Sequence, residues 1–248
     1  MRSALRSRSR QSCSDSPGTT LNRIGSRAIQ RRASDPLLLA VCALGLAQIT
    51  AWGTSYYALG VLAGPIVAQT GWSRSLVYFG FTVALLAMGA VSGWAGRAID
   101  RYGARGVMAV GTVLVSVGLY ALSLVRTEWE YLGVWVFLGV GMRLVLYDAA
   151  FAALVQVVPS RGRRAISYLT LFGAFASTVF WLVGHYLNEA VGWRQTLVLF
   201  ALINLLVCLP LNWLGLARRE AGGAERADRK STRLNSSHSA KSRMPSSA

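Results

Sequence analysis

One arginine of this chain lies deep inside an apolar stretch, where a charge is costly. Arg143 falls about midway along residues 131–158, which we expect to form one continuous helix. At the centre of a bilayer a charge costs roughly 2.5–3.5 kcal/mol on insertion scales, so it faces a cavity or a partner. A guanidinium can hold a carboxylate through two parallel hydrogen bonds. Arg143 is therefore a candidate anchor for an anionic substrate, with a structural ion pair or a snorkelling side chain as the alternative.

The acidic residue nearest in sequence to this arginine is Asp148, but a continuous helix would keep the two apart. Five residues at 100° each amount to about 500°, which leaves the side chains about 140° apart around the axis. Tyr147 would share the face of Arg143 instead and join it in a binding site. We expect Asp148 to point toward a neighbouring helix, where it either pairs with Arg101 or Arg105 or carries a coupling proton.

A second group of polar and aromatic side chains recurs at helical spacing in the first apolar stretch. Gln48, Trp52 and Tyr56 are four residues apart, so they form one partly polar stripe of a helix. This stripe is a candidate wall of the binding site. Ordinary hydrogen bonding between helices is the alternative explanation.

The chain lacks the patterns of an enzyme. We find no His-Glu-x-x-His segment, no phosphate-binding glycine loop and no plausible nucleophile–base pair. The sequence therefore predicts no catalytic residue, no metal site and no cofactor, and a polytopic membrane enzyme is disfavoured.

Six apolar stretches separated by short charged segments account for most of the chain. Hydrophobic residues make up 53% of it and charged residues only 15%. Each stretch is close to the roughly 20 apolar residues that span a bilayer. The fold class is therefore an all-α polytopic membrane protein, with bends expected at Gly60, Gly64 and Pro65 and close helix approach at Gly89-x-x-x-Gly93. The expected helices cover residues 36–67, 76–95, 107–125, 131–158, 165–187 and 196–216.

The basic residues indicate topology rather than nucleic-acid binding, despite a net charge of +16. They gather in tails and short loops, without the aromatic-studded basic face of a nucleic-acid site. Nine loop arginines fall on one side of the six predicted spans and three on the other, which places both termini in the cytosol. The nine are Arg97, Arg101, Arg105, Arg161, Arg163, Arg164, Arg218, Arg219 and Arg226, and the three are Arg74, Arg126 and Arg194.

The charged segment between the second and third stretches carries a recognisable pattern. Its sequence is Gly-x-x-x-Asp-Arg-x-Gly-x-Arg over residues 96–105. It resembles the loop between helices 2 and 3 of the major facilitator superfamily of secondary transporters, although Ala104 stands where a basic residue is commoner. The resemblance implies a conformational latch whose aspartate contacts the opposite half of the transporter. The latch residues would be Gly96, Asp100, Arg101, Gly103 and Arg105, with Asp148 as a partner.

This resemblance covers residues 36–216, which would form one half of such a transporter. The half would contain two inverted three-helix repeats, and a second six-helix half would be missing. Gly71-Trp72-Ser73-Arg74 and the basic cluster 161–164 resemble the monocarboxylate porter and oxalate/formate antiporter branches. We therefore expect alternating-access transport of a small organic anion, such as a monocarboxylate, coupled to a proton or ion across a plasma or inner membrane. A drug or metabolite efflux antiporter and a non-transporting six-helix scaffold are the alternatives.

The two ends differ in composition from the apolar region. Residues 1–35 contain eight arginines against two aspartates and are expected to be a disordered cytosolic tail. Residues 217–227 would begin a central cytosolic linker. Residues 228–248 resemble a translated sequencing adapter, so we expect this segment to be non-native and the chain to be a fragment.

Overall fold

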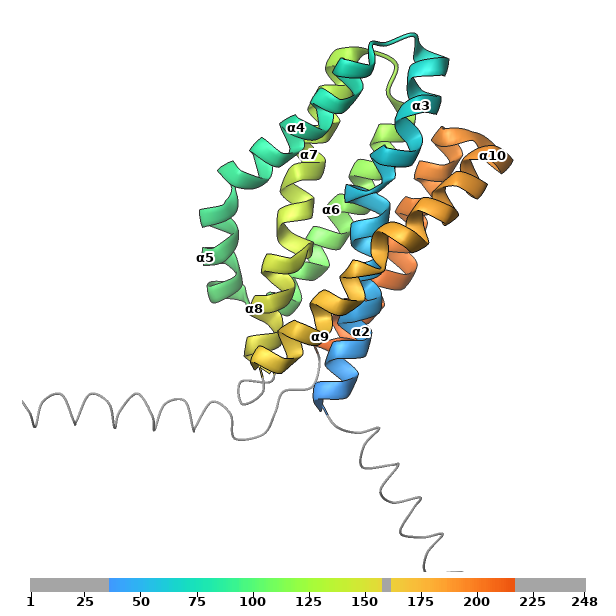
Figure 1. Ribbon diagram of the computed structural model, residues 1–248. Coiled ribbons are helices and arrows are strands. Elements are labelled where there is room, and N and C mark those ends of the chain that lie inside the picture. The colour runs from blue at the N-terminus through green and yellow to red at the C-terminus, as the bar shows by residue number, and fades with distance from the viewer. Residues whose placement is uncertain (1–35, 158–161, 217–248) are drawn as a thin grey trace, which may run out of the picture. The chain divides into compact units, whose positions relative to one another are not determined.

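The computed structural model describes residues 36–157 and 162–216, and every regular element within these ranges is a helix (Figure 1). The prediction of an all-α fold is therefore confirmed. The expected tail 1–35, linker 217–227 and adapter segment 228–248 lie outside the described residues, as does Arg161.

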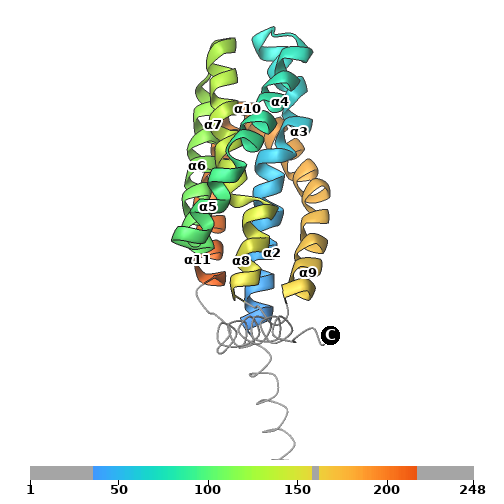
Figure 2. The same ribbon diagram turned by 90° about the vertical axis from the view of Figure 1, so that its left-hand side faces the viewer.

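The described chain runs back and forth through one bundle in six passes. The passes consist, in order, of α2, the π-helix η1 and α3 (Pro36–Ala51, Trp52–Tyr56, Ala58–Thr70); α4 and α5 (Arg74–Ala90, Ser92–Tyr102); α6 (Ala104–Leu124); α7 and α8 (Glu128–Val145, Tyr147–Val157); α9 and the first part of α10 (Gly162–Ala174, Ala176–Ile203); and the rest of α10 with the π-helix η2 and α11 (Asn204–Cys208, Leu209–Gly215). The connection at Gly103 marks what we call the latch end, and the opposite end is the far end. Figure 2 shows α2 between α8 and α9 near the latch end.

The last two passes are joined within α10, where the chain doubles back. Gly192 has φ 81° and ψ 163°, a non-helical conformation that favours glycine. The rings of Phe180 and Phe200 lie 5.8 Å apart, whereas twenty residues of straight helix would separate them by about 30 Å. The residues on either side of Gly192 therefore form two antiparallel helices.

Three helical stretches are long and apolar enough to cross a membrane, residues 104–124, 128–157 and 162–215. The pair α4 and α5, bent by 52°, raises this number to four. The third stretch includes the reversal at Gly192 and so contains two passes. The first pass is divided into shorter helices by η1.

Several predicted boundaries are wrong because the helices are interrupted. The first pass widens at Trp52–Tyr56, earlier than the bends expected at Gly60, Gly64 and Pro65. The segment expected as a loop at 96–105 is helical as far as Tyr102, and only Gly103, with φ 80°, interrupts the helix. The fourth pass is divided at Leu146, where a continuous helix was expected.

A buried polar contact joins the two π-helices. Asn204 of η2 donates from Nδ2 to the hydroxyl oxygen of Thr54 in η1, at 2.7 Å. The Thr54 hydroxyl in turn donates to the Thr50 carbonyl at 2.7 Å. Inside an apolar bundle, such side chains satisfy polar groups that no water reaches.

The far end is fastened by the residues that follow Gly192. The guanidinium of Arg194 donates to the carbonyls of Ser123 and Val125 at 2.5 and 2.8 Å, at the end of α6. The indole of Trp193 donates to the side-chain oxygen of Gln69 in α3. At the far end, the reversal at Gly192 is therefore joined to the end of α3 and to the connection between α6 and α7.

Helices α4 and α7 approach most closely at a glycine. A Cβ added to Gly139 would lie 2.3 Å from the Ala84 carbonyl oxygen. Within the described residues no helix packs against Gly89 or Gly93, so the close approach expected there stays a prediction. Both glycines are exposed, and the nearest atom to an added Cβ is the Arg97 side chain of the same helix, 4.0 Å from the Gly93 position.

We expect Gly139→Ala to destabilise the bundle by about 1–3 kcal/mol, because the new methyl group would overlap backbone atoms that cannot move aside freely. Gly133→Ala on the same helix is the matched control, since a Cβ there meets nothing within 4 Å. Its effect should stay within about 0.5 kcal/mol. Unfolding midpoints in mixed micelles compare the two variants, and equal midpoints would contradict the packing described.

The topology can be tested with cysteines at exposed positions in a background without the native cysteines. We expect Tyr102→Cys and Arg163→Cys to react with an impermeant maleimide only from the cytosolic side, because they lie on the arginine-rich latch end. Trp129→Cys, at the far end, should react only from outside. Labelling of position 102 from outside would reverse the predicted orientation.

Candidate functional site

The fourth pass breaks at Leu146, and this break brings two charged side chains together. Leu146 has φ −75° and ψ −166°, an extended conformation between α7 and α8. Arg143 in the last turn of α7 and Asp148 in the first turn of α8 form a salt bridge. The prediction that the two would point apart is wrong, because it assumed 100° of rotation at every residue.

Each helix end at the break carries the charge that stabilises it. A cation is favoured at the carboxyl end of a helix and an anion at the amino end. Arg143 and Asp148 therefore support the break separately as well as through their ion pair. The arginine side chain is 25% exposed and the aspartate 63%, so the pair borders open space rather than the packed core.

Gln48 lies behind this pair and is used by the structure itself. Its side chain is completely buried, and its Nε2 donates to the carbonyl oxygen of Val145 at 2.8 Å. Its Oε1 accepts a hydrogen bond from the Trp52 indole at 3.1 Å. Gln48 was predicted to line a binding site, but here it is a buried link between the first and fourth passes.

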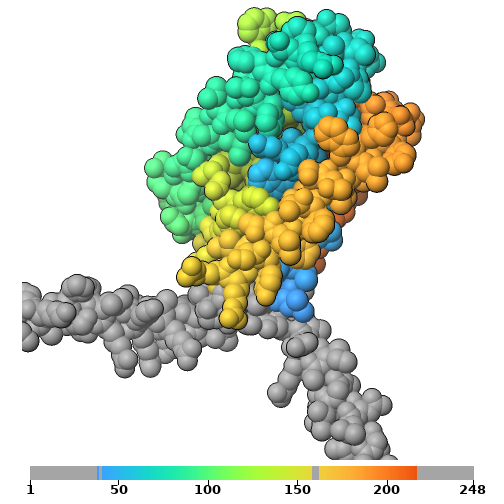
Figure 3. Space-filling model, viewed as in Figure 1, coloured from blue at the N-terminus to red at the C-terminus, as the bar shows by residue number. Residues whose placement is uncertain are grey.

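Aromatic rings from three passes form a continuous group beside the ion pair. The ring of Trp52 lies 4.8 Å from that of Tyr147 and 4.9 Å from that of Tyr56. Phe151 stacks on Tyr147, and Phe81 of α4 meets Tyr56 edge-on. Figure 3 shows the first pass in blue and α7–α8 in yellow-green between α4–α5 and α9–α10. Trp52, Tyr56 and Tyr147 are thus brought together as predicted, whereas Phe81 and Phe151 were missed.

Tyr147 also reaches the fifth pass. A Cβ added to Gly173 of α9 would lie only 1.6 Å from the Tyr147 hydroxyl, so the phenol occupies space that only glycine leaves open. The hydroxyl is 3.4 Å from the Thr170 carbonyl oxygen, to which it donates. Nothing in the sequence spacing pointed to Gly173, because the contact joins two passes.

The predicted latch residues lie at the latch end, away from the ion pair between α7 and α8. Asp100 and Gly96 are exposed, and the backbone N–H of Ala104 donates to the Gln156 side chain at 3.2 Å. The Arg105 guanidinium lies 3.8 Å above the Trp213 ring, and that of Arg101 lies 5.4 Å from the Tyr102 ring. Neither arginine pairs with Asp148 among the described residues, so that expectation is wrong.

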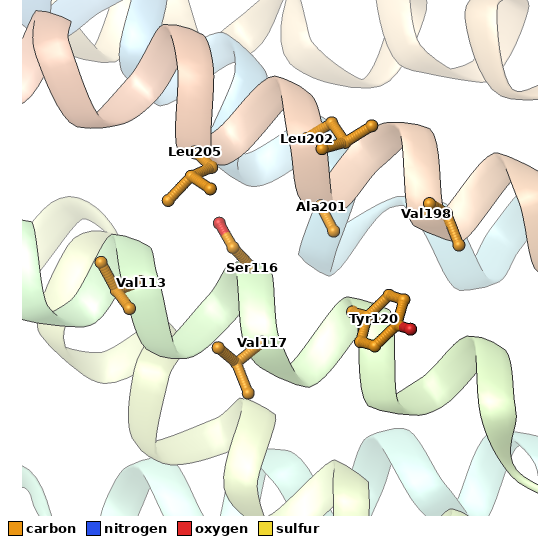
Figure 4. A pocket seen from close by; sticks show the side chains of 8 residues that line it. All are labelled: Val113, Ser116, Val117, Tyr120, Val198, Ala201, Leu202 and Leu205. Atoms are coloured by element: carbon orange, nitrogen blue, oxygen red, sulfur yellow. The ribbon is translucent and has the colours of Figure 1, made fainter.

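An apolar groove on another face is a poor site for an anion. It has a volume of about 330 Å³ and lies between α6 and the segment formed by the second part of α10 and η2 (Figure 4). Its lining residues are Val113, Ser116, Val117, Tyr120, Val198, Ala201, Leu202 and Leu205. Ser116 donates its hydroxyl proton to the Thr112 carbonyl, and the lining contains no charged side chain.

Within residues 36–157 and 162–216, no cluster of three or more His, Cys, Asp or Glu side chains is placed to hold a metal ion. The candidate site therefore consists of Arg143, Asp148 and the aromatic group.

The comparison with known protein families agrees with the helical bundle and its latch segment. The profile of the Major Facilitator Superfamily matches residues 38–244. The matched range includes residues 228–244, for which the adapter origin stays a prediction. No curated protein is similar enough to be matched. The match covers most of the chain, which therefore belongs to the Major Facilitator Superfamily of membrane-embedded secondary transporters.

Proposed function

We propose that the protein transports a small organic anion, such as a monocarboxylate, and that Arg143 is its anchor. The carrying observation is the Arg143–Asp148 pair, a charge pair at a helix break with both side chains partly open. Interrupted helices near the middle of a bundle commonly form the binding sites of secondary transporters. A planar guanidinium suits a carboxylate better than an ammonium does, because it offers two parallel donors.

Asp148 then acts as an internal counter-ion. While the site is empty, its carboxylate occupies Arg143, as the carboxylate of a substrate would. A substrate anion must therefore displace Asp148, and two carboxylates beside one guanidinium leave an excess negative charge. Uptake of a proton by Asp148 would remove that excess, which supports coupling to a proton gradient. An ion gradient of another kind is the alternative.

The aromatic group supplies the apolar side of the site. Trp52, Tyr56 and Tyr147 are each partly exposed, and the Trp52 ring contacts the rings of both tyrosines. A small carboxylate has one charged end and one short apolar end. The arrangement supports binding of the carboxylate at Arg143 with the apolar part against these rings.

A second six-helix bundle completes the proposed transporter. The exposed glycines at positions 93 and 96 leave one face of α5 open to close approach by another helix, and Gly89 is exposed at the end of α4. Asp100 is exposed at the end of the same face and makes no ion pair among the described residues. Alternating access requires a second body against which this bundle can rock.

Arg143→Ala should abolish binding of lactate, and Arg143→Lys should weaken it by about 10- to 100-fold, since the bidentate hydrogen bonds are lost. Asp148→Asn should strengthen binding at neutral pH, because the competing carboxylate is removed. Titration calorimetry on the purified transporter that includes the proposed second bundle measures these affinities. Neutral lactamide, which lacks the carboxylate, is the matched control ligand.

Equal lactate binding by the wild type and Arg143→Ala would show that the arginine is structural. Export of cationic drugs with indifference to carboxylates would favour an efflux antiporter instead. Absence of any transport by that same protein in proteoliposomes would favour a structural scaffold.

Asp100→Asn should affect transport in a different way. Its proposed contact with the second bundle is worth about 1–3 kcal/mol, enough to redistribute inward-facing and outward-facing states. We expect turnover in proteoliposomes to fall about fivefold or more, while lactate affinity changes less than twofold. Arg97→Gln is the control, because it also removes an exposed charge from α5. Equal effects of both variants would indicate a general charge effect.

A further inference from the structure

The break between α7 and α8 and the Arg143–Asp148 pair depend on each other geometrically. In a continuous helix these residues would be about 140° apart around the axis and about 7.5 Å apart along it, so their side chains could not meet. The pair forms because Leu146 is extended. The backbone conformation of one residue therefore decides whether Arg143 is neutralised.

A side chain of α2 supports the broken conformation. In a continuous helix the carbonyl of Val145 would accept the N–H of Ala149. Here α7 ends at Val145, the first hydrogen bond of α8 runs from the Ala150 N–H to the Leu146 carbonyl at 3.1 Å, and Gln48 donates to Val145 at 2.8 Å. An unsatisfied carbonyl is costly inside a membrane protein, so this donor stabilises the break.

Gln48 is itself held in position for this bond. The Trp52 indole donates to its Oε1 at 3.1 Å, and the same ring lies 4.8 Å from the ring of Tyr147, the first residue after the break. The first pass therefore contacts the fourth pass on both sides of Leu146, through Gln48 before the break and through Trp52 after it.

The geometry points to Gln48 as a positioning residue that keeps the fourth pass broken between α7 and α8. Loss of its bond to Val145 would let a continuous helix form and would free Arg143 for an anion. This inference rests on the proposed function of Arg143 as an anion anchor. It adds a second way to free the arginine, besides displacement or protonation of Asp148: a change of backbone conformation at Leu146. A ligand that disturbs Trp52 would shift the balance between the broken and the continuous conformation through Gln48.

Gln48→Leu should favour the continuous helix, because the alternative donor to Val145 is removed. We expect lactate binding to become about three- to tenfold tighter while turnover falls, since Asp148 no longer returns to Arg143. Thr50→Val is the matched control. Thr50 is also buried in α2, but its hydroxyl donates to the carbonyl oxygen of Leu46 in the same helix, at 3.0 Å. Lactate affinity of the control should stay within twofold of the wild type.

Ala149→Pro tests the opposite direction. Only a continuous helix would donate the Ala149 N–H to the Val145 carbonyl, and proline, which lacks this N–H, is tolerated in the first turn of α8. We expect this variant to keep the break and to bind lactate at least as weakly as the wild type. Because it should not gain affinity, it separates the hinge from a general loosening of the bundle.

Amide hydrogen exchange without ligand reads the backbone directly. The first N–H groups of α8, at residues 147–149, lack acceptors within their helix while the break persists. Their exchange should slow about threefold or more in Gln48→Leu and stay at the wild-type rate in Thr50→Val and, for residues 147 and 148, in Ala149→Pro.

Failure of wild-type protein to bind lactate would overturn the proposed function, while the exchange data would still decide on the hinge. Unchanged exchange in Gln48→Leu, or weaker lactate binding by both Gln48→Leu and Thr50→Val, would overturn the inference.

Discussion

A backbone carbonyl inside a bilayer needs a hydrogen-bond donor from the protein, and this constraint determines how the break at Leu146 is held. A soluble protein could leave the last carbonyls of a broken helix to water. Here the carbonyl of Val145 is satisfied by Gln48, which lies 97 residues away in the sequence. The same constraint applies at the far end, where Arg194 covers the carbonyls of Ser123 and Val125. At both places a side chain from another pass supplies the donor that the end of a helix leaves unsatisfied.

The sequence predicted the helices better than their interruptions. Apolar length and loop charge were sufficient for the all-α class and for six passes, because these depend on composition over about 20 residues. The break at Leu146 was missed, since apolar residues surround it and no glycine or proline marks it. One signal was present but was not used. A basic residue followed five positions later by an acidic one fits the end of one helix and the start of the next.

The candidate site shows the same division. Gln48, Trp52 and Tyr56 were grouped correctly because they are spaced along one helix, although Gln48 is buried rather than exposed to a ligand. Phe151 was missed although it lies four residues after Tyr147 in the same helix, whereas Phe81 and Gly173 were missed because their contacts join separate passes. Contacts of that kind depend on how helices pack, and a single sequence without its fold does not specify them.

The two π-helices have a consequence for how this bundle tolerates change in chain length. A π turn closes its hydrogen bond over five residues rather than four, and the Tyr57 N–H donates to the Trp52 carbonyl at 3.0 Å in this way. Removal of one residue within Trp52–Tyr56 would restore an ordinary α turn and leave the rotation of α2 against α3 nearly unchanged, because a π turn accommodates one extra residue. A deletion within the regular part of α2 would instead rotate the residues before it by about 100° against those after it. The widened turn is thus the place in the first pass where the loss of one residue would disturb local contacts but leave Gln48 and the residues after Tyr57 close to their present neighbours.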